Sequence, residues 1–124
     1  MALKIAKGDS IKVTVPAGKN VEAGKFVLIN GFLGLALQSG AEGKEIVLDI
    51  SKGIYQTSQI KATDTFSVGT KIYWDNTEVF TTTATDNKFA GIVTAGKDSN
   101  GVIEFYFIPE LALLSEIISS TQIP

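Results

Sequence analysis

The residues with the most chemical potential lie between Gly91 and Asp98, where the chain reads GIVTAGKD. The two glycines and the lysine have the spacing of a phosphate-binding loop, but Asp98 stands where a serine or threonine hydroxyl would reach magnesium. A carboxylate there would repel phosphate, and such a loop must open a helix, whereas an Asn100-Gly101 turn and a strand come next here. The sequence therefore predicts a hairpin turn in place of a nucleotide site.

Other patterns that could support catalysis or bind a metal are incomplete. Asp98 to Gly101 resembles part of a calcium loop, but the remaining ligands and the closing glutamate are missing. The chain has no histidine and no cysteine, which removes the usual zinc ligands and the commonest general base. Carboxylates that no spacing brings together are expected on the solvated surface: Asp49, Asp64, Asp75 and Glu104. We therefore predict a protein that is not an enzyme and has no cofactor or metal.

Composition narrows the class of partner. The chain of 124 residues has a net charge of −2 and isolated lysines, which gives no basic surface for a nucleic acid. No apolar run reaches the roughly 18 residues of a membrane span, and the first ten residues lack the apolar core of a signal peptide. We expect a globular protein made in the cytoplasm that binds neither nucleic acid nor membrane.

Alternating apolar residues and turn dipeptides predict strands along most of the chain. Ile11, Val13 and Val15 alternate with polar residues, and Asn30-Gly31 is typical of a two-residue hairpin turn. Nine short strands are predicted, near residues 11–15, 25–30, 33–38, 45–50, 54–55, 71–75, 78–83, 89–94 and 101–108. So many short strands with close turns indicate an all-β barrel or sandwich.

The strand pattern occurs twice, at residues 21–49 and, in a longer form, at residues 66–107. The proposed matches are Gly24 with Gly69, Phe32–Leu35 with Phe89–Ile92, Gly40 with Gly96, and Ile46–Ile50 with Val102–Tyr106. An extra hairpin at residues 75–88 lengthens the second copy. Repeated glycines and apolar alternation predict a duplicated scaffold.

The two ends of the chain differ from the β pattern. We expect an N-terminal arm over residues 1–7, a β domain over 8–108, and a short helix with a tail over 109–124. Leu111, Leu114 and Ile118 have helical spacing, and Pro109 suits the first helical position. Because an isolated helix below about 12 residues is marginal in water, these side chains must pack on the barrel or on another chain.

Two aromatic positions are candidates for contact with another protein. Aromatics in strands often fill the core on one face and make contacts on the other, although they can also stack on bases or sugars. Tyr73-Trp74 and the run Phe105 to Phe107 have this pattern. We predict Trp74 and Tyr106 as contact residues.

The repeated glycine pattern resembles a family of small tailed-phage proteins encoded beside the major capsid protein. The resemblance runs from about Ala6 to Ile108 and rests on VPAGKNVEAGKFVLINGFLGLAL, SVGTKIYWDNTEVF and KFAGIVTAGKDSNGVIEFYF. It implies a capsid decoration or head-stabilising protein on the virion surface, whose partner is the major capsid protein. Some members are described as RecA-like recombinases, a role that requires ATP and that the defective phosphate motif argues against.

Granted that resemblance, two terminal segments are expected to make contacts. Leu3 and Ile5 of the arm are predicted to add a strand to an exposed sheet edge, and Leu111, Leu114 and Ile118 to contact a second subunit. A homo-oligomer, with a trimer favoured, would multiply weak contacts. The alternative is a tail or fibre adsorption domain that binds a host glycan through the threonine-rich hairpin, and an enzyme is the third hypothesis.

Overall fold

The structure is a computed structural model that describes residues 9–109, and these form an all-β protein. The strands are β1 (Ser10–Thr14), β2 (Asn20–Val21), β3 (Phe26–Ile29), β4 (Phe32–Ala36), β5 (Gly40–Ala41), β6 (Glu45–Asp49), β7 (Gly53–Thr57), β8 (Lys71–Asp75), β9 (Val79–Thr81), β10 (Lys88–Ala95) and β11 (Ile103–Phe107). The predicted all-β fold is confirmed. Between residues 9 and 109 no helix is long and apolar enough to cross a membrane.

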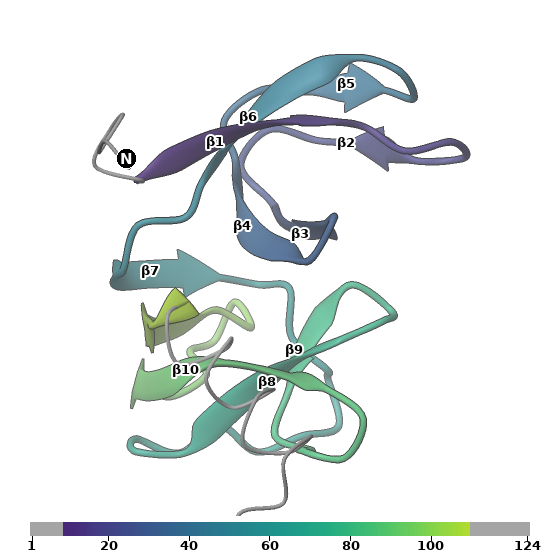
Figure 1. Cartoon of the computed structure of the whole chain (residues 1–124). Coiled ribbons are helices and arrows are strands. Elements are labelled where there is room, and N and C mark those ends of the chain that lie inside the picture. The colour runs from purple at the N-terminus through teal and green to yellow at the C-terminus, as the bar shows by residue number, and fades with distance from the viewer. Residues whose placement is uncertain (1–8, 110–124) are drawn as a thin grey trace, which may run out of the picture. The chain divides into compact units, whose positions relative to one another are not determined.

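The strands belong to two compact units, Met1–Ser51 (unit 1) and Lys52–Pro124 (unit 2). Figure 1 labels the strands of both. Unit 1 contains a four-stranded sheet in the order β1-β6-β4-β3 and the small pair β2-β5. Unit 2 contains a five-stranded sheet in the order β7-β11-β10-β8-β9. The sequence predicted one β domain over residues 8–108, and the division between the units falls between the two copies of the repeat.

All nine predicted strands are present, and two more were not predicted. The additional strands, β2 and β5, are two residues long and pair Asn20 with Ala41 and Val21 with Gly40. Strands this short contain too few residues for an alternation pattern. The expected C-terminal helix and the N-terminal arm lie outside the described residues.

The structure confirms the duplication that the glycines predicted. Neighbouring strands follow the same order in both sheets, with β1, β6, β4 and β3 matching β7, β11, β10 and β8. The backbone bonds before the third strand of each copy also match. In unit 1 the Gly24 N–H donates to Ala36 O at 2.8 Å, and in unit 2 the Gly69 N–H donates to Val93 O at 2.8 Å. Both glycines have a positive φ, of 89° and 88°, which favours glycine over residues with a side chain.

One part of the predicted match is wrong by a single residue. Leu35 pairs with Asp49 in unit 1, and its counterpart Ile92 pairs with Tyr106 in unit 2. Asp49 therefore corresponds to Tyr106, where the sequence comparison had matched it with Phe105. The error arose because apolar alternation repeats every two residues, and only the pairing with the neighbouring strand fixes which residue lies opposite which.

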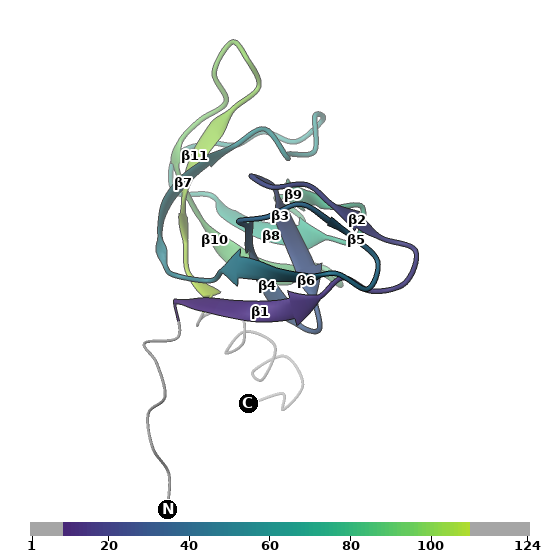
Figure 2. The same ribbon diagram turned by 90° about the horizontal axis from the view of Figure 1, so that it is seen from above.

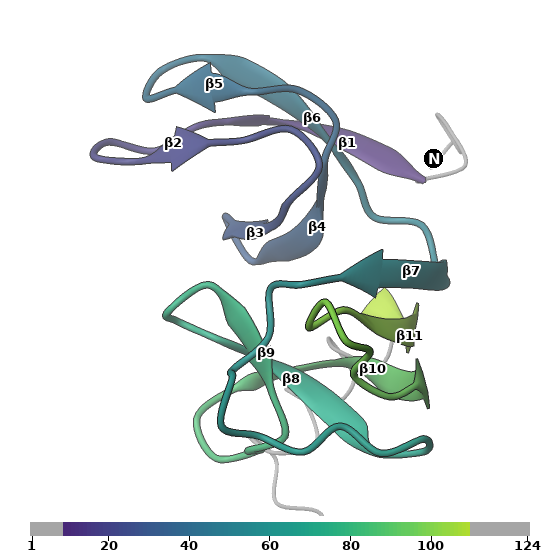
Figure 3. The ribbon, with the colours of Figure 1, turned by 180° about the vertical axis from the view of Figure 1, so that it is seen from behind.

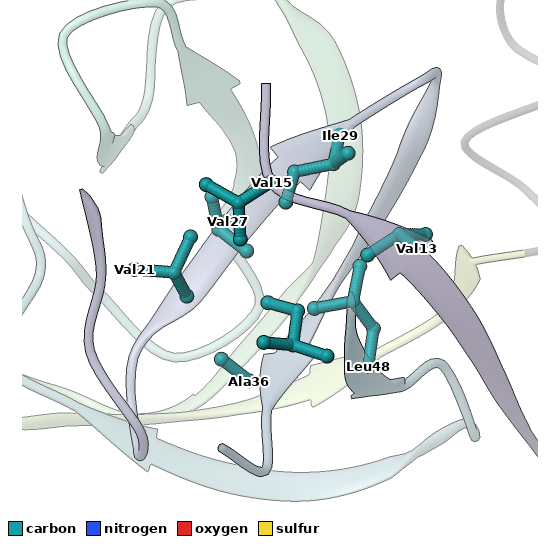
Figure 4. Packing of buried hydrophobic residues seen from close by; sticks show 8 residues of the cluster. Val13, Val15, Val21, Val27, Ile29, Ala36 and Leu48 are labelled. Atoms are coloured by element: carbon teal, nitrogen blue, oxygen red, sulfur yellow. The ribbon is translucent and has the colours of Figure 1, made fainter. Parts of the chain in front are cut away.

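The core of unit 1 is a cluster of aliphatic side chains. Figure 4 shows these side chains converging from four neighbouring segments of the unit. The cluster consists of Val13, Val15, Val21, Val27, Ile29, Ala36, Ile46 and Leu48, each at most 7% exposed. Full burial of a valine, leucine or isoleucine side chain contributes about 1.5–3 kcal/mol, so these residues supply most of the stability of the unit.

Unit 2 has an aromatic core and a sheet that closes on itself. Phe80 is 0% exposed, and its ring lies 4.9 Å from the rings of both Trp74 and Phe105. The Phe80 N–H donates to Gln59 O at 2.7 Å, and Phe80 O accepts from the Lys61 N–H at 2.9 Å. The segment after β7 therefore pairs with β9, which joins the two ends of the strand order into a barrel; Figure 3 shows this segment beside β9. The hairpin β8–β9 that lengthens the second copy is the part that allows closure.

Candidate functional site

The segment that resembles a phosphate-binding loop is a strand followed by a hairpin. Gly91 and the four residues after it lie in β10, and the loop to β11 is visible in Figure 2. The Asp98 carboxylate accepts hydrogen bonds from the Asn100 N–H at 2.8 Å and the Val102 N–H at 3.0 Å. Lys97 Nζ donates to Ala62 O at 3.2 Å. The predicted turn is confirmed, because these groups stabilise the hairpin and no helix begins there.

The four carboxylates that could serve in catalysis each bind a nearby backbone or hydroxyl group. Asp49 accepts hydrogen bonds from the N–H and hydroxyl groups of Ser51, and Asp75 accepts one from the Thr77 N–H. Glu104 accepts a bond from the Thr94 hydroxyl on the neighbouring strand at 2.7 Å. No group of three or more potential metal-ligating residues is found among residues 9–109.

Asp64 is the carboxylate with the clearest structural role. Its Oδ2 accepts a hydrogen bond from the buried Thr81 hydroxyl at 2.5 Å and another from the Thr82 N–H at 2.9 Å. The Thr81 bond lowers the pKa of Asp64 below its ordinary value; burial opposes this effect, and the Thr82 N–H and the positive charge of Lys61 reinforce it. This interaction fastens the segment before β8 to the end of β9.

We expect the stabilisation from Asp64 to depend on pH. Because the folded-state pKa is lowered, the contribution is complete above the unfolded-state pKa of about 3.9 and is lost as pH falls toward the folded-state value. The stability difference between the wild type and Asp64→Asn should therefore shrink below about pH 4. Urea denaturation at pH 7 and at lower pH measures it. Asp86→Asn, at an exposed position of the same unit, is the control, and a pH-independent difference would contradict the prediction.

The structure separates the two aromatic residues that the sequence proposed as contacts. Trp74 is 3% exposed and lies in the core of unit 2, with its ring at 73° to that of Phe80. Tyr106 is 37% exposed. A side chain as buried as Trp74 offers no surface to a partner, so of these two only Tyr106 is placed to make a contact. Alternation was the signal for burial, because Trp74 has the same parity as Ile72 and the opposite parity to Lys71.

Tyr106 belongs to an exposed apolar row on the outer face of unit 2. Ile54 on β7 lies opposite Tyr106 on β11, and Tyr106 lies opposite Ile92 on β10. Ile54 is 64% exposed and Ile92 is half-buried. Side chains paired in this way across antiparallel strands have Cβ atoms about 4.5–5.5 Å apart and so form one continuous patch. We call Ile54, Tyr106 and Ile92 the unit 2 row.

Sequence reasoning identified Tyr106 but missed the rest of the row. Ile54 comes directly after Gly53 in a short strand that reads as ordinary extended structure, and its 64% exposure is unusual for isoleucine. The exposed Gln56 on the same strand was the available signal, because alternation puts Ile54 on the same outer face. The other predicted contact residues lie outside the described residues: Leu3, Ile5, Leu111, Leu114 and Ile118.

Comparison with known families identifies the chain. Residues 5–107 match the family model described as phage cement protein, which covers most of the chain and includes strands of both units. The protein belongs to the phage cement protein family. No curated protein and no solved structure matches the chain.

Membership defines what this cement protein does. It is a structural virion protein that binds the capsid and is found at the capsid surface, and it is not an enzyme. The turn at Gly96–Gly101 and the locally bonded carboxylates are consistent with that role, because they stabilise hairpins of the scaffold. Function must therefore reside in the surfaces that contact other proteins.

Proposed function

We propose that this cement protein binds the major capsid protein on the outer surface of the assembled shell, as a homo-oligomer with a trimer favoured. The observation that carries the proposal is the family match over residues 5–107, since cement proteins bind capsids. The contacts proposed for the shell are Leu3 and Ile5 of the N-terminal arm together with Tyr106. The contacts proposed between subunits involve Leu111, Leu114 and Ile118.

The physical mechanism is linkage between binding and assembly. A ligand that binds the assembled shell more tightly than the free capsid protein stabilises the shell by mass action. A trimer at a three-fold position would engage several weak contacts at once, and the resulting avidity can exceed the single-site affinity by about 10²–10⁴. A modest contact area on each subunit is therefore sufficient.

Binding to shells that lack this protein tests the proposal. The full chain should co-sediment with such shells to saturation, raise the temperature at which they rupture, and give three-fold density in an electron-microscopy map. The variant that lacks residues 1–7 should bind at least tenfold more weakly, because the arm would supply a strand to an exposed sheet edge. Its Trp74 fluorescence should match that of the full chain, which shows that unit 2 still folds.

The outcomes separate the parts of the proposal. Absence of saturable binding by the full chain would contradict attachment to the shell. Undiminished binding by the truncated chain would remove the arm from the contact, and density without three-fold symmetry would exclude the trimer.

A further inference from the structure

The duplication provides an internal comparison for the unit 2 row. The positions of unit 1 that match Ile54, Tyr106 and Ile92 by strand register are Ser10, Asp49 and Leu35. Two of these three residues are polar, so the apolar row is a property of the second unit and not of the scaffold. An apolar row that is exposed in one copy and absent from the other indicates a function specific to unit 2.

The two copies also differ in the segment that the chain enters after the central strand. In unit 1, β6 leads within a few residues into β7, whereas in unit 2 β11 leads into residues 110–124, which lie outside the described residues. By sequence that segment is rich in aliphatic residues, namely Leu111, Leu113, Leu114, Ile117 and Ile118. The exposed row and the apolar segment occur in the same unit, and each needs a partner to remove its surface from water.

We propose that the unit 2 row is the docking site for residues 110–124 of a second copy of this chain. The proposal rests on the homo-oligomer proposed above and assigns its subunit contact. Charge favours this occupant: exposed Lys71 lies opposite Ile92 at one end of the row, and the segment carries Glu110 and Glu116 but no lysine or arginine.

The last described residues favour a second copy over the chain's own segment. The Ile108 N–H donates to Ala90 O at 2.9 Å, so the chain is still held beside β10 after β11 ends. Pro109 comes next, and a proline disfavours helical backbone in the residue before it, so Ile108 continues in the extended direction. The chain therefore runs past the end of the row that contains Tyr106. To cover its own row, the segment would have to reverse direction at once.

A contact between the row of one copy and the segment of the next joins two different surfaces. Such a heterologous contact, repeated by rotation, closes into a ring when the rotation permits it. A three-membered ring would bury three copies of the row and leave no unpaired segment. This geometry agrees with the proposed trimer and gives each subunit the same environment.

Disulfide trapping tests the docking site, because the chain contains no cysteine. One chain carries Ile54→Cys, and a second, lengthened by a tag so that the mixed product has its own mass, carries Leu111→Cys, Leu114→Cys or Ile118→Cys. After mixing and mild oxidation we expect at least tenfold more mixed disulfide for one of these pairs than with Val68→Cys. Val68 is the matched control because it is apolar, 72% exposed and in the same unit.

Each alternative outcome would overturn the docking site. Yields equal to the Val68→Cys control for all three positions would exclude contact between segment and row. Disulfides mainly between two Ile54→Cys chains would indicate a contact of row with row. A chain with both Ile54→Cys and Leu114→Cys that closes an internal disulfide would assign the segment to its own row. Since trapping uses the free protein, its failure leaves shell binding untouched, and a shell that is not bound leaves the trapping result valid.

Discussion

Phe80→Ala is expected to lower the free energy of unfolding of unit 2 by about 3–5 kcal/mol, the usual cost of removing a buried phenylalanine ring. Phe80 is 0% exposed and contacts both Trp74 and Phe105 through its ring. The residue also lies where β9 pairs with the segment after β7, so the cavity would form at the point of barrel closure. Urea denaturation followed by the fluorescence of Trp74, the single tryptophan, measures the change.

Val68→Ala is the matched control for this prediction. Val68 is an apolar residue of the same unit but is 72% exposed, so its truncation should change the free energy of unfolding by less than about 0.5 kcal/mol. A loss below about 1 kcal/mol for Phe80→Ala would show that the aromatic cluster does not limit the stability of unit 2.

Gly91→Ala is expected to destabilise unit 2 by about 3 kcal/mol, at the upper end of the usual cost of overpacking. A Cβ at this position would collide with the backbone carbonyl oxygen of Tyr106, and backbone on a paired strand cannot move aside as a flexible side chain can. Gly34, its counterpart in unit 1, has the same constraint, because a Cβ there would lie 2.9 Å from Asp49 O. We expect a lower denaturation midpoint by Trp74 fluorescence.

Gly53→Ala separates this collision from the general effect of removing a glycine. Gly53 lies on the neighbouring strand β7, and the nearest atom to an added Cβ is Tyr55 Cε1 at 3.7 Å, an ordinary contact. Gly53→Ala should therefore change the stability by less than about 1 kcal/mol, in either direction. Equal effects of the two substitutions would mean that the approach of Tyr106 does not determine the requirement for glycine at position 91.

Much of the scaffold could be predicted from the sequence because its signals are local. Ile11, Val13 and Val15 alternate within one strand, and Asn30-Gly31 turns directly into the next strand, with φ values of 53° and 82° that few other residues accept. The duplication was visible for the same reason, since its glycines occupy positions that need a positive φ or a close backbone approach. The short strands β2 and β5 were missed because two residues cannot show a period.

The candidate site was less predictable because it depends on which strands become neighbours. Tyr106 was identified from its aromatic character, but Ile54 is distant in sequence and joins it only through the pairing of β7 with β11. Trp74 was proposed as a contact for the same chemical reason as Tyr106, although it faces the core. Residue type alone does not distinguish a buried aromatic from an exposed one.

By itself, the sequence determined that this protein is a duplicated β scaffold in which the phosphate-like segment around Gly96 is a turn. Alternation and turn preferences act over a few residues, so they can be recognised without knowing the partners of a strand. The tertiary structure alone decided the one-residue register of the repeat, the closure of unit 2 through Phe80, and the alignment of Ile54, Tyr106 and Ile92. These features require hydrogen bonds between segments far apart in the chain, and local patterns do not specify such pairings.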